Sequence, residues 1–130
     1  MKEDRTVMNE KATTSTEDYL ASIEKITRDK GTCRSVDVAE DLDVARASVS
    51  IAVKKLIEEG YVQFGREHEL KLTEEGKKIA DSVLKRRQVL TYGLRRIGVS
   101  KENAERDAHR MEHAISEETL NKLMEELSKD

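Results

Sequence analysis

One short segment of this chain carries the alternation of a β-hairpin, whereas the other regular segments carry helical spacing. Apolar and polar residues alternate in Tyr61–Phe64 and again in Glu69–Leu72, around a polar turn at Gly65–His68. Residues 61–72 therefore predict a hairpin. The sequence has no proline and no tryptophan, and 39% of its residues are charged. We expect a mainly helical chain with one small sheet and a modest core, whose helices rely partly on a partner subunit.

Helical periodicity and capping signals divide the rest of the chain. Thr14-Ser15-Thr16-Glu17 matches a capping box, which predicts the start of the first helix at Thr14 and leaves residues 1–13 as a mobile tail. Gly60 and Gly98 end two of the later helices. The expected helices cover approximately residues 14–30, 35–42, 45–59, 73–97, 100–115 and 116–127.

Helix, short helix, tight turn, helix and hairpin is the order of a winged helix-turn-helix. In such a module the third helix enters the major groove of DNA, and the hairpin wing lies along the DNA backbone. The expected third helix and wing offer cations and hydroxyls for phosphates and bases. These candidate DNA-binding residues are Arg46, Ser48, Ser50, Lys54 and Arg66. We expect a DNA-binding domain at residues 14–73 and a helical dimerisation and metal-binding domain at residues 74–130.

The charge distribution supports a nucleic-acid partner more than the net charge does. The whole chain has a formal net charge of −3, but residues 25–96 hold 16 basic and 12 acidic side chains. Residues 97–130 hold 5 basic and 9 acidic side chains. The predicted helix-turn-helix and wing therefore lie in the basic part of the chain.

His109-Arg110-Met111-Glu112-His113 places three metal-capable side chains within five residues. On a helix, positions i, i+3 and i+4 share one face, so both imidazoles and the carboxylate can converge. This mixture suits a divalent transition metal, with further ligands from elsewhere in the fold. The same His-x-x-Glu-His pattern occurs in zinc hydrolases of the inverzincin type. An enzyme would leave the helix-turn-helix and the basic wing unexplained, so we expect a binding protein.

Four segments recur in the order of a known family. They are Thr16–Leu20, Val36–Leu56, Leu72–Gly76 and Glu112–Glu118. Together they resemble the diphtheria-toxin-repressor, or iron-dependent repressor, family of metal-dependent transcriptional regulators. The chain ends before an SH3-like third domain, which resembles the short two-domain members typified by the manganese transport regulator. The resemblance implies a homodimer that binds a palindromic DNA operator when its metal site is filled, usually repressing metal-uptake genes.

The resemblance also implies a set of metal ligands. One metal site in the family joins a residue of the first helix to a triplet on the fifth helix. The matching positions are Asp18, His109, Glu112 and His113. Aspartate at the first position is typical of manganese members, so manganese or iron is expected. Two histidines would also accept zinc or cobalt.

The second metal site of the family is altered in this chain. Arg87 stands where the family has a histidine, and a guanidinium cannot ligate a metal. Ala21 and Thr91 replace two further ligands, and Glu105 stands where iron members have a histidine, so of these positions only Glu105 could still ligate. We expect Arg87 to form an ion pair with Glu105 or Glu112, and the chain to bind one metal ion or none.

A regulator that has lost metal control stays open as an alternative. It would answer to redox chemistry at Cys33, the one cysteine of the chain, or to a protein partner. A buried and inert thiol is the more usual state of such a residue. No apolar run reaches the length of a membrane span and the N-terminus lacks a secretory signal, so we expect a cytoplasmic protein without membrane contact. Ala45 and Ala47 depart from the family in the DNA-reading helix, so the operator sequence does not carry over.

Overall fold

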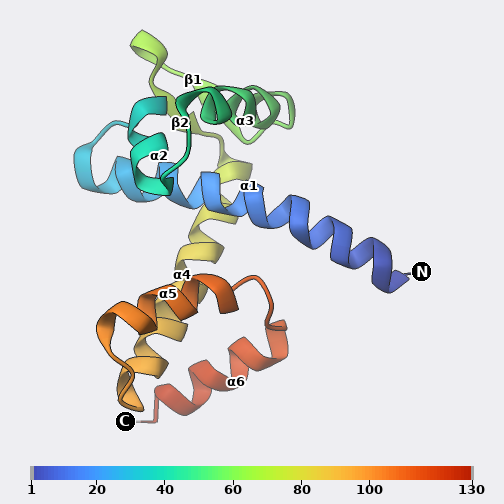
Figure 1. Ribbon diagram of the computed structural model, residues 1–130, viewed down its shortest axis with the longest axis vertical. Coiled ribbons are helices and arrows are strands. Elements are labelled where there is room, and N and C mark those ends of the chain that lie inside the picture. The colour runs from blue at the N-terminus through green and yellow to red at the C-terminus, as the bar shows by residue number, and fades with distance from the viewer. Residues whose placement is uncertain (1, 130) are drawn as a thin grey trace. The chain divides into compact units, whose positions relative to one another are not determined.

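The computed structural model describes the backbone of residues 2–129 and the side chains of residues 16–129. Its elements are α1 (Lys2–Lys30), α2 (Ser35–Leu42), α3 (Arg46–Glu58), β1 (Val62–Phe64), the 3-10 turn η1 (Arg66–His68), β2 (Leu70–Leu72), α4 (Glu74–Arg96), α5 (Lys101–Met111) and α6 (Glu117–Leu127) (Figure 1). They form two compact units, Met1–Asp81 and Ser82–Asp130, which divide within α4. The expected mainly helical fold with one hairpin is confirmed.

The core of the first unit lies where α1, α2, α3 and the hairpin pack together (Figure 1). Its buried side chains are Leu20, Ile23, Ile26, Cys33, Val38, Ala39, Val49, Val53, Leu56, Val62, Leu70 and Ala80. On α1 and α3 these residues recur at intervals of three or four positions, so each of these two helices turns a single apolar stripe inward. The polar face of α3 is consequently left toward solvent.

The turn of the helix-turn-helix depends on local backbone features. Asp37 accepts a hydrogen bond from the backbone N–H of Arg34 at 2.9 Å, which closes the start of α2. Asp43 ends α2 in the left-handed conformation, with φ of 55°, a conformation that aspartate tolerates better than most residues. Ala45 precedes α3 and makes no side-chain capping bond, as expected for a methyl group.

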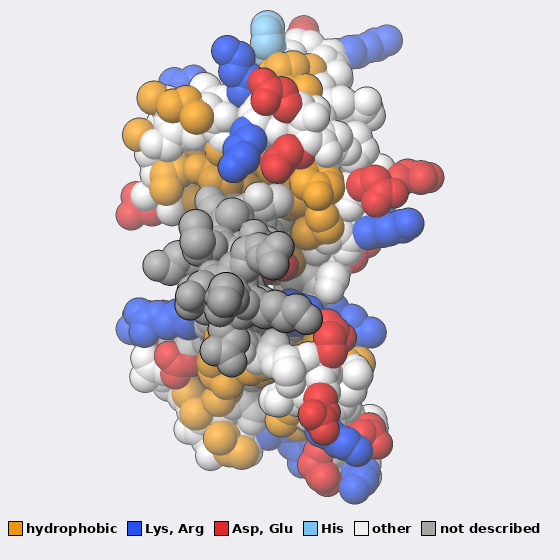
Figure 2. Space-filling view, turned by 90° about the vertical axis from the view of Figure 1, so that its right-hand side faces the viewer, with side chains coloured by type: hydrophobic (Ala, Val, Ile, Leu, Met, Phe, Trp, Pro, Cys, Tyr) orange, Lys and Arg blue, Asp and Glu red, His pale blue; other side chains and the backbone are white. Residues whose placement is uncertain are grey.

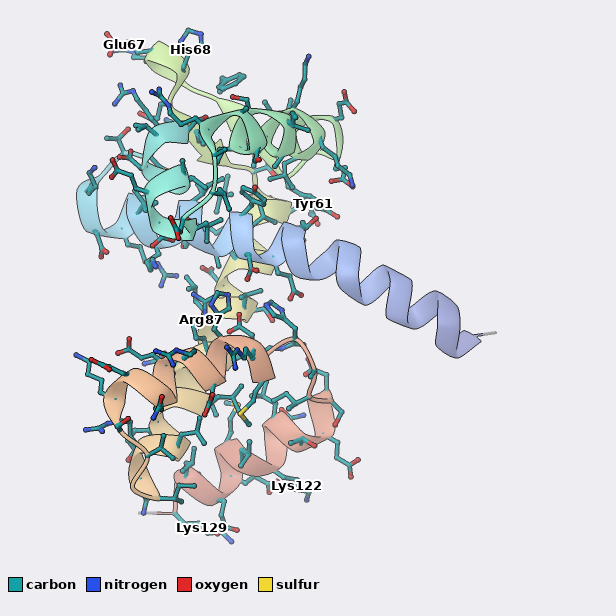
Figure 3. All side chains as sticks on the ribbon, in the orientation of Figure 1. Tyr61, Glu67, His68, Arg87, Lys122 and Lys129 are labelled. Atoms are coloured by element: carbon teal, nitrogen blue, oxygen red, sulfur yellow. The ribbon has the colours of Figure 1, made fainter. Side chains whose placement is uncertain are left out.

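The predicted hairpin is confirmed. β1 and β2 pair antiparallel, with Val62 opposite Leu72 and Phe64 opposite Leu70. The backbone N–H of Leu70 donates to the carbonyl of Cys33 at 2.7 Å, which ties the hairpin to the segment before α2. Figure 3 labels Glu67, next to His68 at the tip of the hairpin. Both tip residues have positive φ, so the tip is a tight left-handed turn.

The first turns of α4 belong to the first unit. Thr73 caps the helix, since its hydroxyl oxygen accepts the N–H of Gly76 at 3.2 Å. Lys77 donates to the buried carboxylate of Glu24 at 2.8 Å, and Ala80 lies in the core. Burial, the largest single influence, would raise the pKa of Glu24, but the interactions of its carboxylate with Lys77, Asp81 and Arg28 together lower the pKa. These contacts place the division between the units at residue 81, eight residues beyond the expected domain boundary.

The expected start of the first helix at Thr14 is wrong, because α1 begins at Lys2. Residues 2–13 contain no glycine or proline, and seven of the twelve are Lys, Arg, Glu, Met or Ala, residues that favour helix. The helix therefore runs through the segment that resembles a capping box. Side chains of residues 1–15 lie outside the described part of the chain, and the mobility expected of residues 1–13 stays a prediction.

The second unit consists of the later part of α4 with α5 and α6 (Figure 1). Ser100 and Ser116 cap α5 and α6 as predicted, accepting the backbone N–H of Asn103 at 3.4 Å and of Thr119 at 3.1 Å. The apolar residues buried here are Val83, Leu90, Ala104, Ala108 and Leu120. Within residues 2–129, no helix carries a stretch long and apolar enough to cross a membrane.

Several large apolar side chains remain exposed among the described residues. They are Val44, Ile51, Phe64, Tyr92 and Ile97. Figure 2 shows hydrophobic side chains lying among acidic and basic ones on the face that it draws. The first three come from the helix-turn-helix and the hairpin, and the other two from the end of α4 and the residue that follows it.

Candidate metal centre and nucleic-acid interface

The three metal-capable side chains of the second unit gather at the end of α5. One ligand atom from each of His109, Glu112 and His113 lies within 4.8 Å of the others. His109 is in the last turn of α5, and Glu112 follows the helix with nearly helical φ and ψ of −58° and −28°. The i, i+3, i+4 relation predicted from the sequence therefore brings these side chains together.

The expected extension of this helix to Ile115 is wrong, because α5 ends at Met111. The backbone N–H of Ala114 donates to the carbonyl of Met111 at 2.9 Å, an i to i+3 bond that tightens the last turn. Ser116 then adopts an extended conformation to cap α6. Because the cap of α6 lies so near, α5 ends four residues before the predicted end, and His113 lies in the turn that follows the helix.

Arg87 holds the carboxylate of Glu112 in a bidentate ion pair. Its Nε donates to Oε2 at 3.0 Å and its Nη2 donates to Oε1 at 2.9 Å. Only 1% of the Glu112 side chain is exposed, compared with 23% of Arg87. Figure 3 labels Arg87 on α4. Of the two partners expected for this arginine, the structure pairs it with Glu112, while Glu105 lies exposed.

The residues of this cluster fit a divalent transition metal. Two imidazoles and one carboxylate are suitable donors, and both histidines are partly buried. The Nε2 of His113 lies 3.4 Å from Oε1 of Glu112. A carboxylate has about four lone-pair positions, and Arg87 uses one on each oxygen. Glu112 thus keeps acceptor capacity beside the imidazoles. Asp18 belongs to α1 of the first unit, and its role as a ligand stays a prediction.

The predicted DNA-binding side chains are exposed in the first unit. Arg46, Ser48, Ser50 and Lys54 lie on the solvent side of α3, and Arg66 lies in the turn of the hairpin. The opposite side of α3 is anchored in the core through Val49, Val53 and Leu56. Core packing therefore holds the polar face of α3 outward, where cations and hydroxyls can meet phosphates and base edges.

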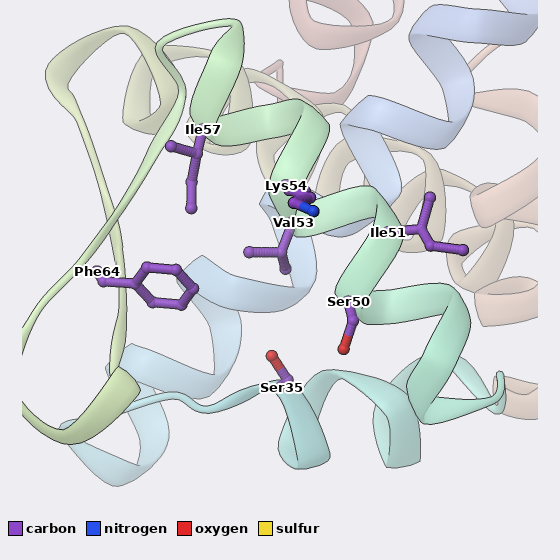
Figure 4. Close-up of a pocket in the computed structure, with 7 residues that line it drawn as sticks. All are labelled: Ser35, Ser50, Ile51, Val53, Lys54, Ile57 and Phe64. Atoms are coloured by element: carbon purple, nitrogen blue, oxygen red, sulfur yellow. The ribbon is translucent and has the colours of Figure 1, made fainter.

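A surface hollow of about 340 Å³ connects α3 with the hairpin (Figure 4). It is lined by Ser35, Ser50, Ile51, Val53, Lys54, Ile57 and Phe64. Phe64 faces α3 across the hollow (Figure 4), and 54% of its side chain is exposed. Residues of both α3 and the hairpin therefore line the same hollow.

Ile51 is a surface residue that the sequence reasoning missed, with 72% of its side chain exposed. Val49 and Val53 mark the buried stripe of α3, and Ile51 is two positions from each. At 100° per residue this spacing turns Ile51 away from that stripe. The periodicity of α3 could therefore have identified it.

Comparison with known sequences decides the family. Residues 11–69 match the iron dependent repressor N-terminal DNA binding domain. Residues 73–129 match the iron dependent repressor metal binding and dimerisation domain. The chain belongs to the iron-dependent repressor family. The two matched domains carry the two surfaces described above, one in each part of the chain.

Members of this family named as regulators resemble the chain over most of its length. The HTH-type transcriptional regulator MntR of Geobacillus kaustophilus (strain HTA426) is 37% identical over 111 residues, which are 85% of this chain and 79% of that protein. The transcriptional regulator MntR of Escherichia coli O157:H7 is 38% identical over 104 residues, which are 80% of this chain and 67% of that protein.

Several solved structures share the fold of this chain. The T. acidophilum IdeR structure matches with a TM-score of 0.77 and 29% identity over 88% of this chain, which spans 54% of that longer chain. A hypothetical protein from Sulfolobus solfataricus, SSo2273, matches with a TM-score of 0.63 and 27% identity over 88% of both chains. A manganese-dependent transcriptional repressor in complex with manganese matches with a TM-score of 0.79 at 23% identity, which bears on the fold alone.

Family membership settles the choice between enzyme and regulator. The relatives are transcriptional regulators and the two matched domains bind DNA and metal. The prediction that the chain is not an enzyme is confirmed. The zinc-hydrolase alternative drawn from His-x-x-Glu-His is wrong, because the pattern here lies in the metal-binding and dimerisation domain of a repressor family.

Cys33 is fully buried in the core of the first unit. Burial raises the pKa of its thiol to about 12, and the thiolate is the reactive form of cysteine. We expect Cys33 in the folded protein to react with Ellman's reagent at pH 8 far more slowly than in urea-unfolded protein. Equal rates under both conditions would contradict a buried thiol and reopen the redox alternative.

Proposed function

We propose that this chain is a cytoplasmic, metal-responsive transcriptional repressor that binds a palindromic operator as a homodimer and controls metal-uptake genes. The observation that carries the proposal is the cluster of His109, Glu112 and His113 in the metal-binding domain. The exposed face of α3 in the other domain supports the DNA-binding part of the proposal.

We propose Asp18 as a further ligand, on the basis of its place in the Thr16–Leu20 segment that resembles the family. The metal would then connect α1 to the end of α5, and so fix the DNA-reading unit relative to the dimerisation unit. Without metal the first unit would sample several orientations, and few of them would suit the operator. Metal binding would thus act as a population shift. Manganese or iron is the expected ion, while zinc and cobalt suit the same donors.

The homodimer is proposed to form through the second unit. This unit matches the dimerisation domain of the family. It also exposes 52% of Tyr92 and 78% of Ile97 at the C-terminal end of α4. A dimer would present its two α3 helices about one duplex turn apart, which is the spacing that a palindromic operator requires.

The proposed DNA surface combines charge with an apolar contact. Lys54 and Arg66 would neutralise phosphates, and Ser50 would bond a phosphate or a base edge. Ile51 would contact a thymine methyl group, a typical apolar base contact in the major groove.

Direct measurement of metal-dependent DNA binding tests the proposal. An operator fragment selected with the purified protein would be titrated in the presence of Mn²⁺, Fe²⁺, Co²⁺ or Zn²⁺, and of a chelator. We expect at least one metal to strengthen binding, by roughly 5- to 150-fold for a typical allosteric coupling. Tight operator binding that persists in the chelator would instead favour a regulator without metal control. The Arg87–Glu112 ion pair is the observation that favours this alternative.

Lys54→Ala is expected to weaken operator binding and to lower its salt dependence. Loss of one phosphate contact reduces the slope of log affinity against log salt by about 1. Lys122→Ala is the matched control, since Lys122 is an exposed lysine on α6 of the second unit (labelled in Figure 3). Fluorescence anisotropy would measure the operator binding of both variants between about 50 and 200 mM salt, a range in which phosphate contacts strongly affect affinity. An equal loss in the two variants would contradict the proposed surface.

A further inference from the structure

We propose that Arg87 is a resident cation of the metal centre, which limits the centre to one metal ion and lowers its affinity for that ion. The inference rests on the proposed function, because it concerns the metal that His109, Glu112 and His113 would hold. It goes beyond that function by assigning a role to a residue that cannot be a ligand.

The geometry shows how completely Arg87 engages Glu112. Two parallel hydrogen bonds of 3.0 and 2.9 Å join the guanidinium to the two carboxylate oxygens. This fork-to-fork arrangement is the strong form of an arginine–carboxylate pair. Because Glu112 is 1% exposed, its charge would be costly without a partner. Arg87 therefore supplies the positive charge that the buried carboxylate needs in the absence of metal.

The lone pairs of Glu112 leave room for one further cation. Arg87 takes one position on each oxygen, so a metal ion beside the imidazoles can still bind Oε1 through a remaining position. A carboxylate can bridge two metal ions, but here the guanidinium already occupies the side that faces α4. Since a guanidinium has no lone pair to donate and stays charged, it excludes a second ion there. We expect one metal ion per subunit.

Arg87 also affects how tightly that ion binds. A permanent positive charge on the shared carboxylate repels an incoming dication, and the repulsion is strong where water is scarce. Arg87 has an opposing effect, since it orients Glu112, and loss of such outer partners typically weakens metal sites about 10- to 100-fold. Without Arg87, however, the buried carboxylate would lose its bidentate cation, and a bound metal ion would replace that positive charge. We expect the electrostatic effect to prevail, so removing the charge should strengthen metal binding.

Arg86 provides a matched control. It is the neighbouring arginine on α4, and its Nη2 donates to the Glu117 carboxylate at 2.6 Å. It approaches Glu112 through the backbone carbonyl, at 3.5 Å. Neutralising Arg86 therefore removes a positive charge from the same helix without freeing the Glu112 carboxylate.

The test is calorimetric titration of Mn²⁺ into metal-free protein, for the wild type and for Arg87→Gln, Arg87→Lys and Arg86→Gln. We expect one ion per wild-type subunit and about tenfold or tighter binding in Arg87→Gln. Arg87→Lys keeps the charge and is expected to stay near the wild-type affinity, as is Arg86→Gln. The thermal stabilisation that saturating Mn²⁺ confers should be larger in Arg87→Gln than in the wild type, because binding to the folded state alone stabilises it.

Two results would overturn the inference about Arg87. One is an Arg87→Gln variant that binds Mn²⁺ no more tightly than the wild type, and the other is two Mn²⁺ ions per wild-type subunit. The wild-type stoichiometry tests the limit of one ion even if Arg87→Gln does not fold without metal, and the affinity of Arg87→Lys, which keeps the charge, then tests the electrostatic part. Wild-type protein that binds no divalent metal would overturn the proposed function itself, and with it the role of Arg87. If only the inference about Arg87 is wrong, metal-stimulated operator binding would remain intact, so the two failures are distinguishable.

Discussion

Glu112→Gln is expected to abolish the stimulation of operator binding by metal while leaving the protein folded. Glutamine keeps the size of the buried side chain and one acceptor oxygen, but it removes the negative charge that a dication requires. The variant should lose the whole metal effect, which is worth about 1–3 kcal/mol of coupling in typical allosteric proteins. Operator binding measured by fluorescence anisotropy with and without Mn²⁺ would show the loss.

Glu117→Gln is the matched control for this variant. Glu117 lies five positions further along the chain, its side chain is 69% exposed, and it pairs with Arg86 rather than Arg87. It should therefore retain the metal response. Circular dichroism of both variants would establish that each is folded, since Glu112→Gln leaves Arg87 beside a neutral partner. An unchanged metal response in a folded Glu112→Gln protein would reject Glu112 as a ligand.

Gly76→Ala is expected to destabilise the protein strongly. Gly76 lies in the first turn of α4, and the position that a Cβ would take on it faces the backbone of Tyr61. An added Cβ would overlap the Tyr61 carbonyl oxygen and come within 3.0 Å of the carbonyl carbon. That carbonyl also accepts the N–H of Thr73 at 3.0 Å, so it cannot move without straining the end of the hairpin. Overpacking of this kind costs about 1–3 kcal/mol, and more where backbone must shift.

Gly93→Ala tests whether the cost at Gly76 comes from this close contact. Gly93 lies in the same helix, but a Cβ there would lie 3.5 Å from Cδ1 of Leu127, which is ordinary van der Waals contact. Alanine is favoured over glycine inside a helix by about 1 kcal/mol, so Gly93→Ala should be neutral or stabilising. Urea denaturation of the two variants would measure the difference in the free energy of unfolding. Equal losses would show that glycine flexibility in α4, rather than the contact with Tyr61, is what matters.

Local sequence patterns predicted most of the elements because they depend on neighbours in the chain. The hairpin at residues 61–72 follows from strict alternation, and the caps at Thr73, Ser100 and Ser116 follow from hydroxyls placed before apolar periodic segments. The same patterns predicted that α3 would carry its cations on one face. Such features require no knowledge of which elements later pack together.

Two helix ends escaped prediction because helix boundaries depend on small energy differences. A capping box at Thr14 predicted a start, but helix-favouring residues before it continue α1 back to Lys2. Helical spacing predicted α5 as far as Ile115, but the turn that leads to the Ser116 cap ends it at Met111. In both places two local signals competed, and the pattern alone does not rank them.

By itself the sequence determined the class of protein and grouped the proposed metal donors. Spacing within five residues placed His109 and Glu112 together, since a helical turn brings i and i+3 side by side whatever the helix packs against. Only the tertiary structure decided that Arg87, 25 positions away in the chain, takes Glu112 rather than Glu105 as its partner. The choice depends on burial, because a carboxylate removed from water needs a cation and an exposed one does not. Burial is a property of packed helices, and no local pattern contains it.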